Sequence, residues 1–357
     1  MLTGVVVVNK EIILITGVSG RVGARLAQRL SENYQVIGFD KIIEDKLPDV
    51  DYVTVDLGLE ESLHKGLKYI SDRYGKRICS VVHLAVLRNI DEEKRGNSPG
   101  PDLVATELLF KGLRKYQLEI GQFIFSSTIF VHTSSKDGET INEHSPVIPK
   151  ANDSKSKVLV EDLIHRMQGD IPTAILRVGN IYDDRCHCLS LASQIQRIYE
   201  RTWSAHIFPG DLNAGSPFLH IDDFVEAIAL VIRKKKDLPH DLVLILGENQ
   251  TYSYGQWQKA IGMSIHGVDW MTWSIPVSLV KLFLCFRVYF NLGQKNDFQS
   301  WFIDGVARSY LLDTSRSKKM LGWQPKSHAI EYVSIWSEQL KKDPARWYED
   351  NQLRPNQ

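Results

Sequence analysis

The chain has 357 residues, 43% of them hydrophobic, and its 43 basic and 43 acidic residues give a formal net charge of zero. This length and apolar content allow a large buried core and two lobes. The balanced charge argues against nucleic acid or strongly acidic molecules as general partners. Four cysteines suggest a reducing compartment. Residues 1–8 are apolar but lack the basic start of a signal peptide, so we expect a cytoplasmic protein.

The first predicted elements are a buried strand over 12–15 and a helix over 24–30, joined by a glycine-rich turn. The turn reads Thr16-Gly17-Val18-Ser19-Gly20-Arg21-Val22-Gly23, with glycines three residues apart. Small residues let backbone N–H groups and the positive end of the helix approach a pyrophosphate. We therefore predict that the turn binds the phosphates of a dinucleotide through Gly17, Ser19, Gly20, Arg21, Val22 and Gly23.

A second predicted strand, 34–39, ends in Asp40, about twenty residues beyond the turn. A carboxylate there accepts hydrogen bonds from both hydroxyls of an adenosine ribose and repels a 2′-phosphate. NAD is therefore favoured over NADP, although the neighbouring cation Lys41 keeps NADP open. The plainer alternative is a solvated aspartate at the end of a strand.

Two more predicted strands end in polar motifs, 51–55 before Asp56-Leu57 and 78–82 before His83-Leu84-Ala85. Together with the glycine-rich turn, these motifs resemble the extended short-chain dehydrogenase/reductases, the NAD-dependent epimerase/dehydratase family. Further matches follow in order at residues 123–128, Ser156-Lys157 with Glu161, 176–182, 220–223 and 321–325. The resemblance spans nearly the whole chain.

The resemblance implies an α/β fold, a Rossmann-type doubly wound parallel sheet with a smaller C-terminal substrate lobe. It implies NAD as cofactor and a homodimer formed by the helices near 103–116 and 157–167. Lys157 would bond the nicotinamide ribose, while Asn180 and His132 would face the substrate. The other cofactor contacts that it implies are Asp56, Leu57, Leu84, Ala85, Val86 and Ser126.

The predicted catalytic site departs from the family at one position. The family unit is a Ser or Thr hydroxyl, a tyrosine and a lysine, and Thr128 and Lys157 match the first and last. The tyrosine position holds Asp153, and no tyrosine lies between Tyr116 and Tyr182. The reference pKa of aspartate lies about 6 pH units below that of tyrosine, or roughly 8 kcal/mol of basicity. An aspartate is also shorter than a phenol.

Several explanations of Asp153 stay open. It could act as the acid/base directly or through a water. It could also only cap the helix that begins there, or form an i,i+4 ion pair with Lys157. Val131-His132 stands where the family usually has Tyr-Gly, and His132 is an alternative base or a polar surface residue. Asp102 replaces the usual asparagine in the helix after the fourth strand.

We expect a Rossmann domain over 1–178, returning at about 221–247. The substrate lobe would comprise 179–220 and 248–345, with a tail over 346–357. No metal site is expected, because Cys186-His187-Cys188 is too tightly spaced for zinc. The apolar stretch 270–292 is interrupted by Pro276, Lys281 and Arg287, which argues against a transmembrane helix. It is either a buried helix or one that meets a lipid-like substrate or a membrane surface, so peripheral membrane contact stays open.

Two functions follow as hypotheses. The first is an NAD-dependent epimerase/dehydratase-like oxidoreductase that acts on a nucleotide sugar or related hydroxyl compound through Thr128, Asp153 and Lys157. The second is an NAD-binding pseudoenzyme with a sensor or structural role. The altered tyrosine position favours the second, while the cofactor residues fit both. No motif in the second lobe identifies the substrate.

Overall fold

A computed structural model describes residues 10–86, 100–135, 139–279 and 309–355. The chain divides into two packing units. The first consists of residues 1–131, 152–177 and 225–244, and the second of 132–151, 178–224 and 245–357. Each unit is interrupted in sequence.

The first unit is built on a seven-stranded sheet with the order β12-β8-β7-β5-β1-β2-β3. Each of the pairs β1–β2, β2–β3, β1–β5 and β5–β7 is parallel. The order runs outward in both directions from β1, which confirms the predicted doubly wound sheet. The strands are β1 (Ile12–Thr16), β2 (Gln35–Asp40), β3 (Val50–Thr54), β5 (Ser80–His83), β7 (Phe123–Thr128), β8 (Thr173–Val178) and β12 (Asp241–Leu246).

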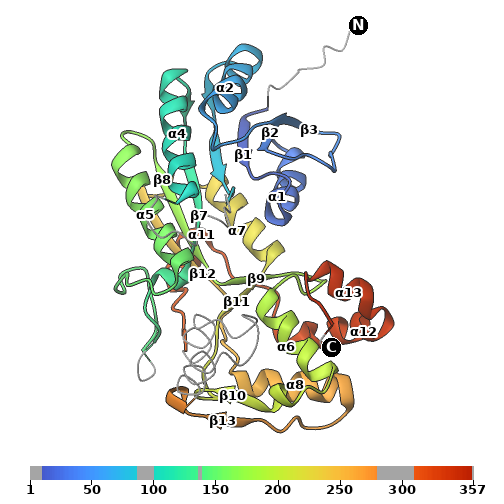
Figure 1. The fold of residues 1–357 in the computed structure, drawn as a ribbon. Helices are drawn as coiled ribbons and strands as arrows, with labels where there is room; N and C mark the ends of the chain where they lie inside the picture. The colour runs from blue at the N-terminus through green and yellow to red at the C-terminus, as the bar shows by residue number, and fades with distance from the viewer. Residues whose placement is uncertain (1–9, 87–99, 136–138, 280–308, 356–357) are drawn as a thin grey trace, which may run out of the picture. The chain divides into compact units, whose positions relative to one another are not determined.

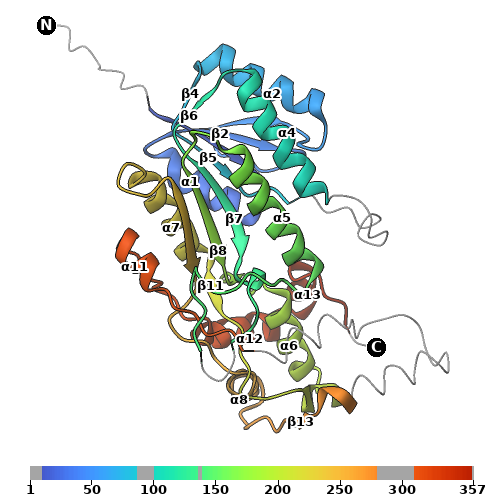
Figure 2. The ribbon, with the colours of Figure 1, turned by 90° about the vertical axis from the view of Figure 1, so that its left-hand side faces the viewer.

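Helices cover both faces of this sheet, as Figures 1 and 2 show. On one face α2, α4 and α5 pack side by side. On the other face lie α1 and α7, joined by an ion pair between Arg29 and Glu226 at 3.2 Å. The bounds are α1 (Arg21–Ser31), α2 (Glu60–Tyr74), α4 (Pro101–Lys115), α5 (Asn152–Met167) and α7 (Ile221–Arg233). A short parallel pair, β4 (Arg77–Ile78) with β6 (Glu119–Ile120), lies outside the main sheet.

The strands are apolar on both faces because helices bury both. Ile13, Leu14 and Ile15 of β1 are all inaccessible to solvent. In α1 the buried residues Gly23, Leu26, Ala27 and Leu30 recur at helical spacing, as predicted. Burial of each large aliphatic side chain contributes about 1.5–3 kcal/mol, which fixes the strand ends that carry the polar motifs.

The second unit contains two short parallel strand pairs and a helical layer. The pairs are β9 (Asn180–Tyr182) with β11 (Phe218–His220) and β10 (Ile207–Pro209) with β13 (Trp273–Ile275). Its helices are α6 (Leu189–Tyr199), α8 (Tyr254–His266), α11 (Ser315–Leu321), α12 (Val333–Lys342) and α13 (Pro344–Asp350). One short 3₁₀ helix, Ile129–Val131, directly follows β7 in the first unit. Two more in the second unit, Trp203–His206 and Ala329–Tyr332, directly precede β10 and α12.

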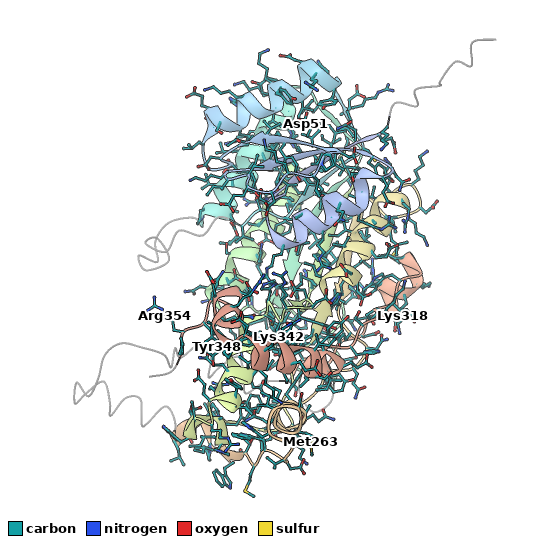
Figure 3. All side chains as sticks on the ribbon, turned by 90° about the vertical axis from the view of Figure 1, so that its right-hand side faces the viewer. Asp51, Met263, Lys318, Lys342, Tyr348 and Arg354 are labelled. Carbon is teal, nitrogen blue, oxygen red and sulfur yellow. The ribbon has the colours of Figure 1, made fainter. Side chains whose placement is uncertain are left out.

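Aromatic side chains form the core of the second unit. Trp336 and Tyr182 are fully buried, and their rings meet edge to face with centroids 5.6 Å apart. The end of the chain joins this core, because Trp347 of α13 is 4% exposed. Tyr348, labelled in Figure 3, donates its hydroxyl to Glu200 at 2.8 Å. The stretch 346–355 is thus packed against the unit.

The apolar stretch 270–292 is described only as far as residue 279. Its described part includes buried Trp270 at 8% exposure and solvent-exposed Met271 and Trp273 at 65% and 57%. The rest of the stretch, 280–292, lies outside the described residues. In the described ranges, no helix has the length and apolar character needed to cross a membrane.

Candidate cofactor and catalytic site

The glycine-rich turn has the geometry of a phosphate cradle. Gly17 has a φ of +75°, which is left-handed, and its N–H bonds the Phe39 carbonyl at 2.8 Å. A Cβ at Gly17 would lie 2.8 Å from the backbone nitrogen of Ala85. A Cβ at Gly23 would lie 2.1 Å from the Gly17 carbonyl oxygen. Both positions therefore exclude a side chain, which brings the start of α1 close to the ends of β1 and β5.

Asp40 is fixed at the carboxyl end of β2 beside this turn. Its Oδ2 accepts the Ser19 N–H at 2.9 Å, and its Oδ1 accepts the Lys41 N–H at 2.8 Å. The Lys41 ammonium turns to Asp56 instead, at 2.9 Å, and this bond lowers the pKa of the Asp56 carboxyl. Lys41 is thus engaged by a carboxylate, and at the predicted ribose contact the charge of Asp40 would repel a 2′-phosphate. The arrangement fits NAD better than NADP.

The other residues assigned to the cofactor by resemblance also lie at strand ends of the first unit. Asp56 and Leu57 follow β3, Leu84, Ala85 and Val86 follow β5, and Ser126 belongs to β7. Dinucleotides bind at the carboxyl ends of the strands, where the order of a doubly wound sheet reverses. That point is between β1 and β5, where Thr16 pairs with His83. These contacts stay predictions.

Two of the three predicted catalytic residues lie on α5, and the third ends β7. Lys157 is buried, at 8% exposure, and its ammonium stands over the Phe125 ring at 4.9 Å. Burial lowers the pKa of Lys157, and the charges of Asp102, Asp153 and Glu161 oppose this in decreasing order. The hydroxyl of Thr128 accepts the N–H of Phe130 at 3.3 Å.

Asp153 lies in the first turn of α5, and its side chain is exposed. Among the described residues no ion pair joins Asp153 to Lys157, so the i,i+4 pair considered from the sequence is not formed. Asp102 is the larger opposing charge on the lysine, and it is buried at 9% exposure in the first turn of α4. Sequence reasoning noted Asp102 only as a departure from the family.

His132 and Asn180 belong to the second unit. The alternative of a polar surface histidine at position 132 is wrong, because His132 is 1% exposed. Its Nδ1 bonds the Pro146 carbonyl at 3.2 Å, and its backbone bridges Val147. The amide of Asn180 donates to the Pro217 carbonyl at 3.3 Å. Whether either residue faces substrate stays a prediction.

A buried ion pair joins α5 to β8 of the sheet. Arg177 of β8 binds Glu161 of α5 through two bonds, Nε to Oε1 at 3.2 Å and Nη2 to Oε2 at 2.6 Å. Ser127 of β7 donates its hydroxyl to the same carboxylate. Both charged side chains are at most 7% exposed. Sequence analysis named Glu161 and Arg177 within separate motifs but did not pair them, because the partners lie on different elements.

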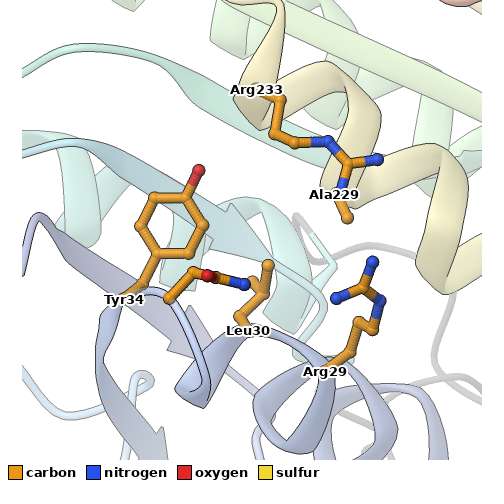
Figure 4. A pocket seen from close by; sticks show the side chains of 6 residues that line it. Arg29, Leu30, Tyr34, Ala229 and Arg233 are labelled. Carbon is orange, nitrogen blue, oxygen red and sulfur yellow. The ribbon is translucent and has the colours of Figure 1, made fainter.

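A cavity between α1 and α7 lies away from the glycine-rich turn (Figure 4). It measures about 280 Å³ and is lined by the ends of α1 and α7, with Tyr34 at its side. Arg29 and Arg233 both bind Glu226 there, at 3.2 and 2.6 Å. Those contacts satisfy the cavity's charges and do not involve the glycine-rich turn. In the described part of the chain, no cluster of metal-ligating side chains is found.

The site and sheet define a class, the NAD-binding Rossmann proteins. A family model described as the NAD dependent epimerase/dehydratase family matches residues 13–247. The chain belongs to this family, and its cofactor is NAD. The turn that excludes Cβ atoms and the anchored Asp40 fit that cofactor. No curated protein sequence matches the chain.

Solved structures with the same fold include two epimerases and a dehydratase of nucleotide sugars. UDP-glucose 4-epimerase of Thermotoga maritima, solved with UDP-glucose, is 21% identical, with a TM-score of 0.66 over 93% of this chain and 99% of that one. dTDP-glucose 4,6-dehydratase of Bacillus anthracis, solved with NAD, is 17% identical, with a TM-score of 0.69 over 95% and 99%. UDP-glucuronic acid 4-epimerase of Bacillus cereus is 19% identical, with a TM-score of 0.67 over 93% and 99%. These identities are low enough that the likeness establishes the fold alone.

Proposed function

We propose that the chain is an NAD-dependent oxidoreductase that acts on a hydroxyl group of a nucleotide-linked sugar or a related compound. Bound NAD would supply the hydride acceptor. The observation that carries this proposal is Lys157, a buried cation on α5 next to the strand that ends in Thr128. Burial of a lysine cation costs free energy, and a lysine whose pKa is lowered by burial is a candidate functional group. Lys157 also lies in the unit that holds the glycine-rich turn.

The proton would be handled by Asp153 or by a water bound to it. Asp153 lies one helical turn before Lys157, with its carboxylate open to solvent. An ionised carboxylate accepts protons, but it is weaker than a phenolate by roughly 8 kcal/mol on reference pKa values. Thr128 would orient the substrate hydroxyl. The proposed enzyme therefore turns over more slowly than one with tyrosine at this position.

The proposed substrate class rests on the structural neighbours. The names of these proteins contain UDP-glucose, dTDP-glucose and UDP-glucuronic acid, all sugars carried on a nucleoside diphosphate. This chain covers 98 to 99% of the length of the neighbours with which it aligns, so it has room for the same two-part architecture. The sugar itself is left open by the proposal.

A second function, an NAD-binding protein with little turnover, is favoured by one observation. The residue in the tyrosine position is exposed and makes no ion pair with Lys157 among the described residues, while buried Asp102 is the larger charge beside the lysine. A lysine held by carboxylates would bind cofactor without activating an acid. Such a protein would report cofactor state or act as a structural partner.

Variants of Asp153 and Lys157 separate the two functions. The purified chain is titrated with NAD, mixed with a panel of nucleotide sugars, and followed by nicotinamide absorbance. For an enzyme, Asp153→Asn lowers cofactor reduction at least ten-fold and leaves the NAD affinity unchanged. For the binding protein, wild type and Asp153→Asn are equally inactive, and Asp153→Tyr creates activity. Lys157→Ala weakens NAD binding in both cases, so its failure to do so would refute the cofactor site.

We also propose a cytoplasmic homodimer, with α4 and α5 forming the contact between two copies. Val104 of α4 and Leu159 of α5 are exposed at 37% and 48%, which supports an apolar contact there. Sedimentation equilibrium of wild type and Leu159→Glu tests the dimer. A dimer converted to monomer by the substitution supports the proposal, and a monomeric wild type contradicts it.

Peripheral membrane contact remains a proposal for the second unit. Trp203, Met271 and Trp273 are exposed at 76%, 65% and 57%, and side chains of this type favour the interface of a bilayer. Co-sedimentation with vesicles of phosphatidylcholine and phosphatidylglycerol tests it. Binding that is reduced by Trp203→Ser with Trp273→Ser supports contact. Protein that stays in the supernatant rules it out.

A further inference from the structure

A chain of buried hydrogen bonds crosses the first unit at the point where β1 and β5 end. Thr16 Oγ1 lies 2.7 Å from His83 Nδ1, and His83 Nε2 lies 3.0 Å from Thr106 Oγ1. Thr106 Oγ1 lies 2.7 Å from the Asp102 carbonyl oxygen, and the Ala85 N–H points at Thr16 Oγ1 from 3.5 Å. Thr16 and Thr106 are fully buried, and His83 is 2% exposed.

The Asp102 carbonyl oxygen, at one end of the chain of hydrogen bonds, fixes the direction of the other bonds. A carbonyl oxygen can only accept, so the Thr106 hydroxyl donates to Asp102 and must itself accept from His83 Nε2. His83 is then the neutral Nε2–H tautomer, and its Nδ1 accepts the hydroxyl of Thr16. This leaves the Thr16 oxygen free to accept from Ala85. If the Thr106 hydroxyl instead donated to His83 Nε2, Thr106 Oγ1 and the Asp102 carbonyl oxygen would lie 2.7 Å apart without a proton between them.

The surroundings of His83 keep it neutral. Burial lowers its pKa to about 3, and the nearby charge of Lys157 acts in the same direction. The His83 imidazole stacks on the Phe125 ring, with centroids 5.9 Å apart. The Lys157 ammonium lies over the same Phe125 ring, 4.9 Å from its centroid. A protonated His83 would face the Lys157 cation, and its Nδ1–H would have to donate to Thr16 Oγ1, whose own hydroxyl proton would then need another acceptor.

The hydrogen-bond chain joins three parts of the cofactor site. Thr16 immediately precedes Gly17, and Ala85 is the residue that a Cβ on Gly17 would strike. At the far end, Asp102 opens α4 and provides the largest opposing charge on Lys157. We propose that His83, as the neutral Nε2–H tautomer, is a positioning residue for NAD, holding the glycine-rich turn and the first turn of α4 in fixed relation.

This inference rests on the NAD site of the proposed function but not on turnover. Nitrogen-15 NMR of the wild-type protein reads the tautomer directly, with His83→Gln identifying its signal among the 11 histidines. The expected spectrum shows a protonated Nε2 and an unprotonated Nδ1 between pH 5 and 7. A protonated Nδ1, or an imidazolium in this range, would overturn the assignment, whether or not the protein binds NAD.

A set of threonine variants tests the positioning role. Thr106→Val removes the bond to Asp102 and leaves His83 Nε2–H without an acceptor, whereas Thr106→Ser keeps both. We expect Thr106→Val to weaken NAD binding about ten-fold in calorimetry, with Thr106→Ser close to wild type. The matched control is Thr173→Val. Thr173, the first residue of β8, is also buried, at 1% exposure, but its hydroxyl bonds the side chains of Gln168 and Asp241, which do not belong to the chain of bonds through His83.

The outcomes are distinguishable. If Thr106→Val and Thr173→Val affect NAD affinity equally, a general loss of stability explains the result and the positioning role is refuted. If the wild-type protein binds no NAD, the cofactor assignment and the positioning role fail together, while the tautomer remains readable. Loss of affinity in Thr106→Val alone, with rescue by serine, supports the proposal.

Discussion

The buried pair of Glu161 and Arg177 makes a strong prediction about stability. In Glu161→Gln the side chain keeps its size but loses its charge, and the Arg177 guanidinium, 7% exposed, loses its counter-ion. An amide nitrogen would also face a guanidinium that can only donate. Breaking a buried pair from one side costs about 3–5 kcal/mol. Against a total stability of roughly 5–15 kcal/mol, this is a large fraction.

Urea unfolding measures the effect. With a denaturant slope of about 3 kcal/mol/M, a loss of this size lowers the midpoint by about 1–1.7 M. All eight tryptophans fall within the residue ranges of the second unit. Far-ultraviolet circular dichroism therefore reports the first unit together with the second, and tryptophan fluorescence reports the second unit separately. The dichroism transition should shift more than the fluorescence transition.

The control is an exposed pair in the same unit. Glu119 binds Arg77 at 3.1 Å, with side chains 66% and 91% exposed. Such pairs contribute about 0–1 kcal/mol, so Glu119→Gln should leave the midpoint nearly unchanged. Replacing both Glu161 and Arg177 by apolar residues should recover much of the lost stability. A Glu161→Gln midpoint equal to that of Glu119→Gln would refute the reasoning.

Three further predictions follow from the site and the second unit. Asp56→Asn frees Lys41 and should raise the ratio of NADP affinity to NAD affinity about five-fold in calorimetry, and an unchanged ratio would contradict this. Gly23→Ala should abolish NAD binding, because the new Cβ would lie 2.1 Å from the Gly17 carbonyl oxygen, and retained affinity would show that the turn can shift. Burial raises the pKa of Glu248 to about 8, so the folded state holds a proton that the unfolded state releases above its ordinary pKa of about 4.5. Stability should therefore fall by several kcal/mol as the pH rises from about 5 to 8, and Glu248→Gln should remove this slope in urea unfolding followed by tryptophan fluorescence.

Local patterns were enough to predict the sheet and the cofactor turn. The fully buried run of β1 and the glycines that follow it are adjacent in sequence, and their geometry depends on neighbours only a few residues away. Asp40 could be placed for the same reason, since the end of β2 fixes it. Each of these features follows from strand length, apolar content and the missing Cβ.

Contacts between distant elements could not be predicted in this way. Spacing suggested that Asp153 would pair with Lys157, yet burial turns the lysine inward and leaves the aspartate exposed. The bonds from His83 to Thr16 and Thr106 join residues 67 and 23 positions apart. Periodicity identifies which face of an element is buried, but the partner on that face is set by how the sheet and helices pack.

The central claim is an NAD site that is intact beside an acid/base position that is altered. Calorimetric titration with NAD and NADP, followed in the same sample by nucleotide sugars, tests it most directly. We predict tighter binding of NAD than of NADP, and reduction of the bound cofactor when a sugar substrate is added. Absence of NAD binding would contradict the cofactor assignment on which both proposed functions depend, whereas binding without reduction would favour the NAD-binding protein over the enzyme.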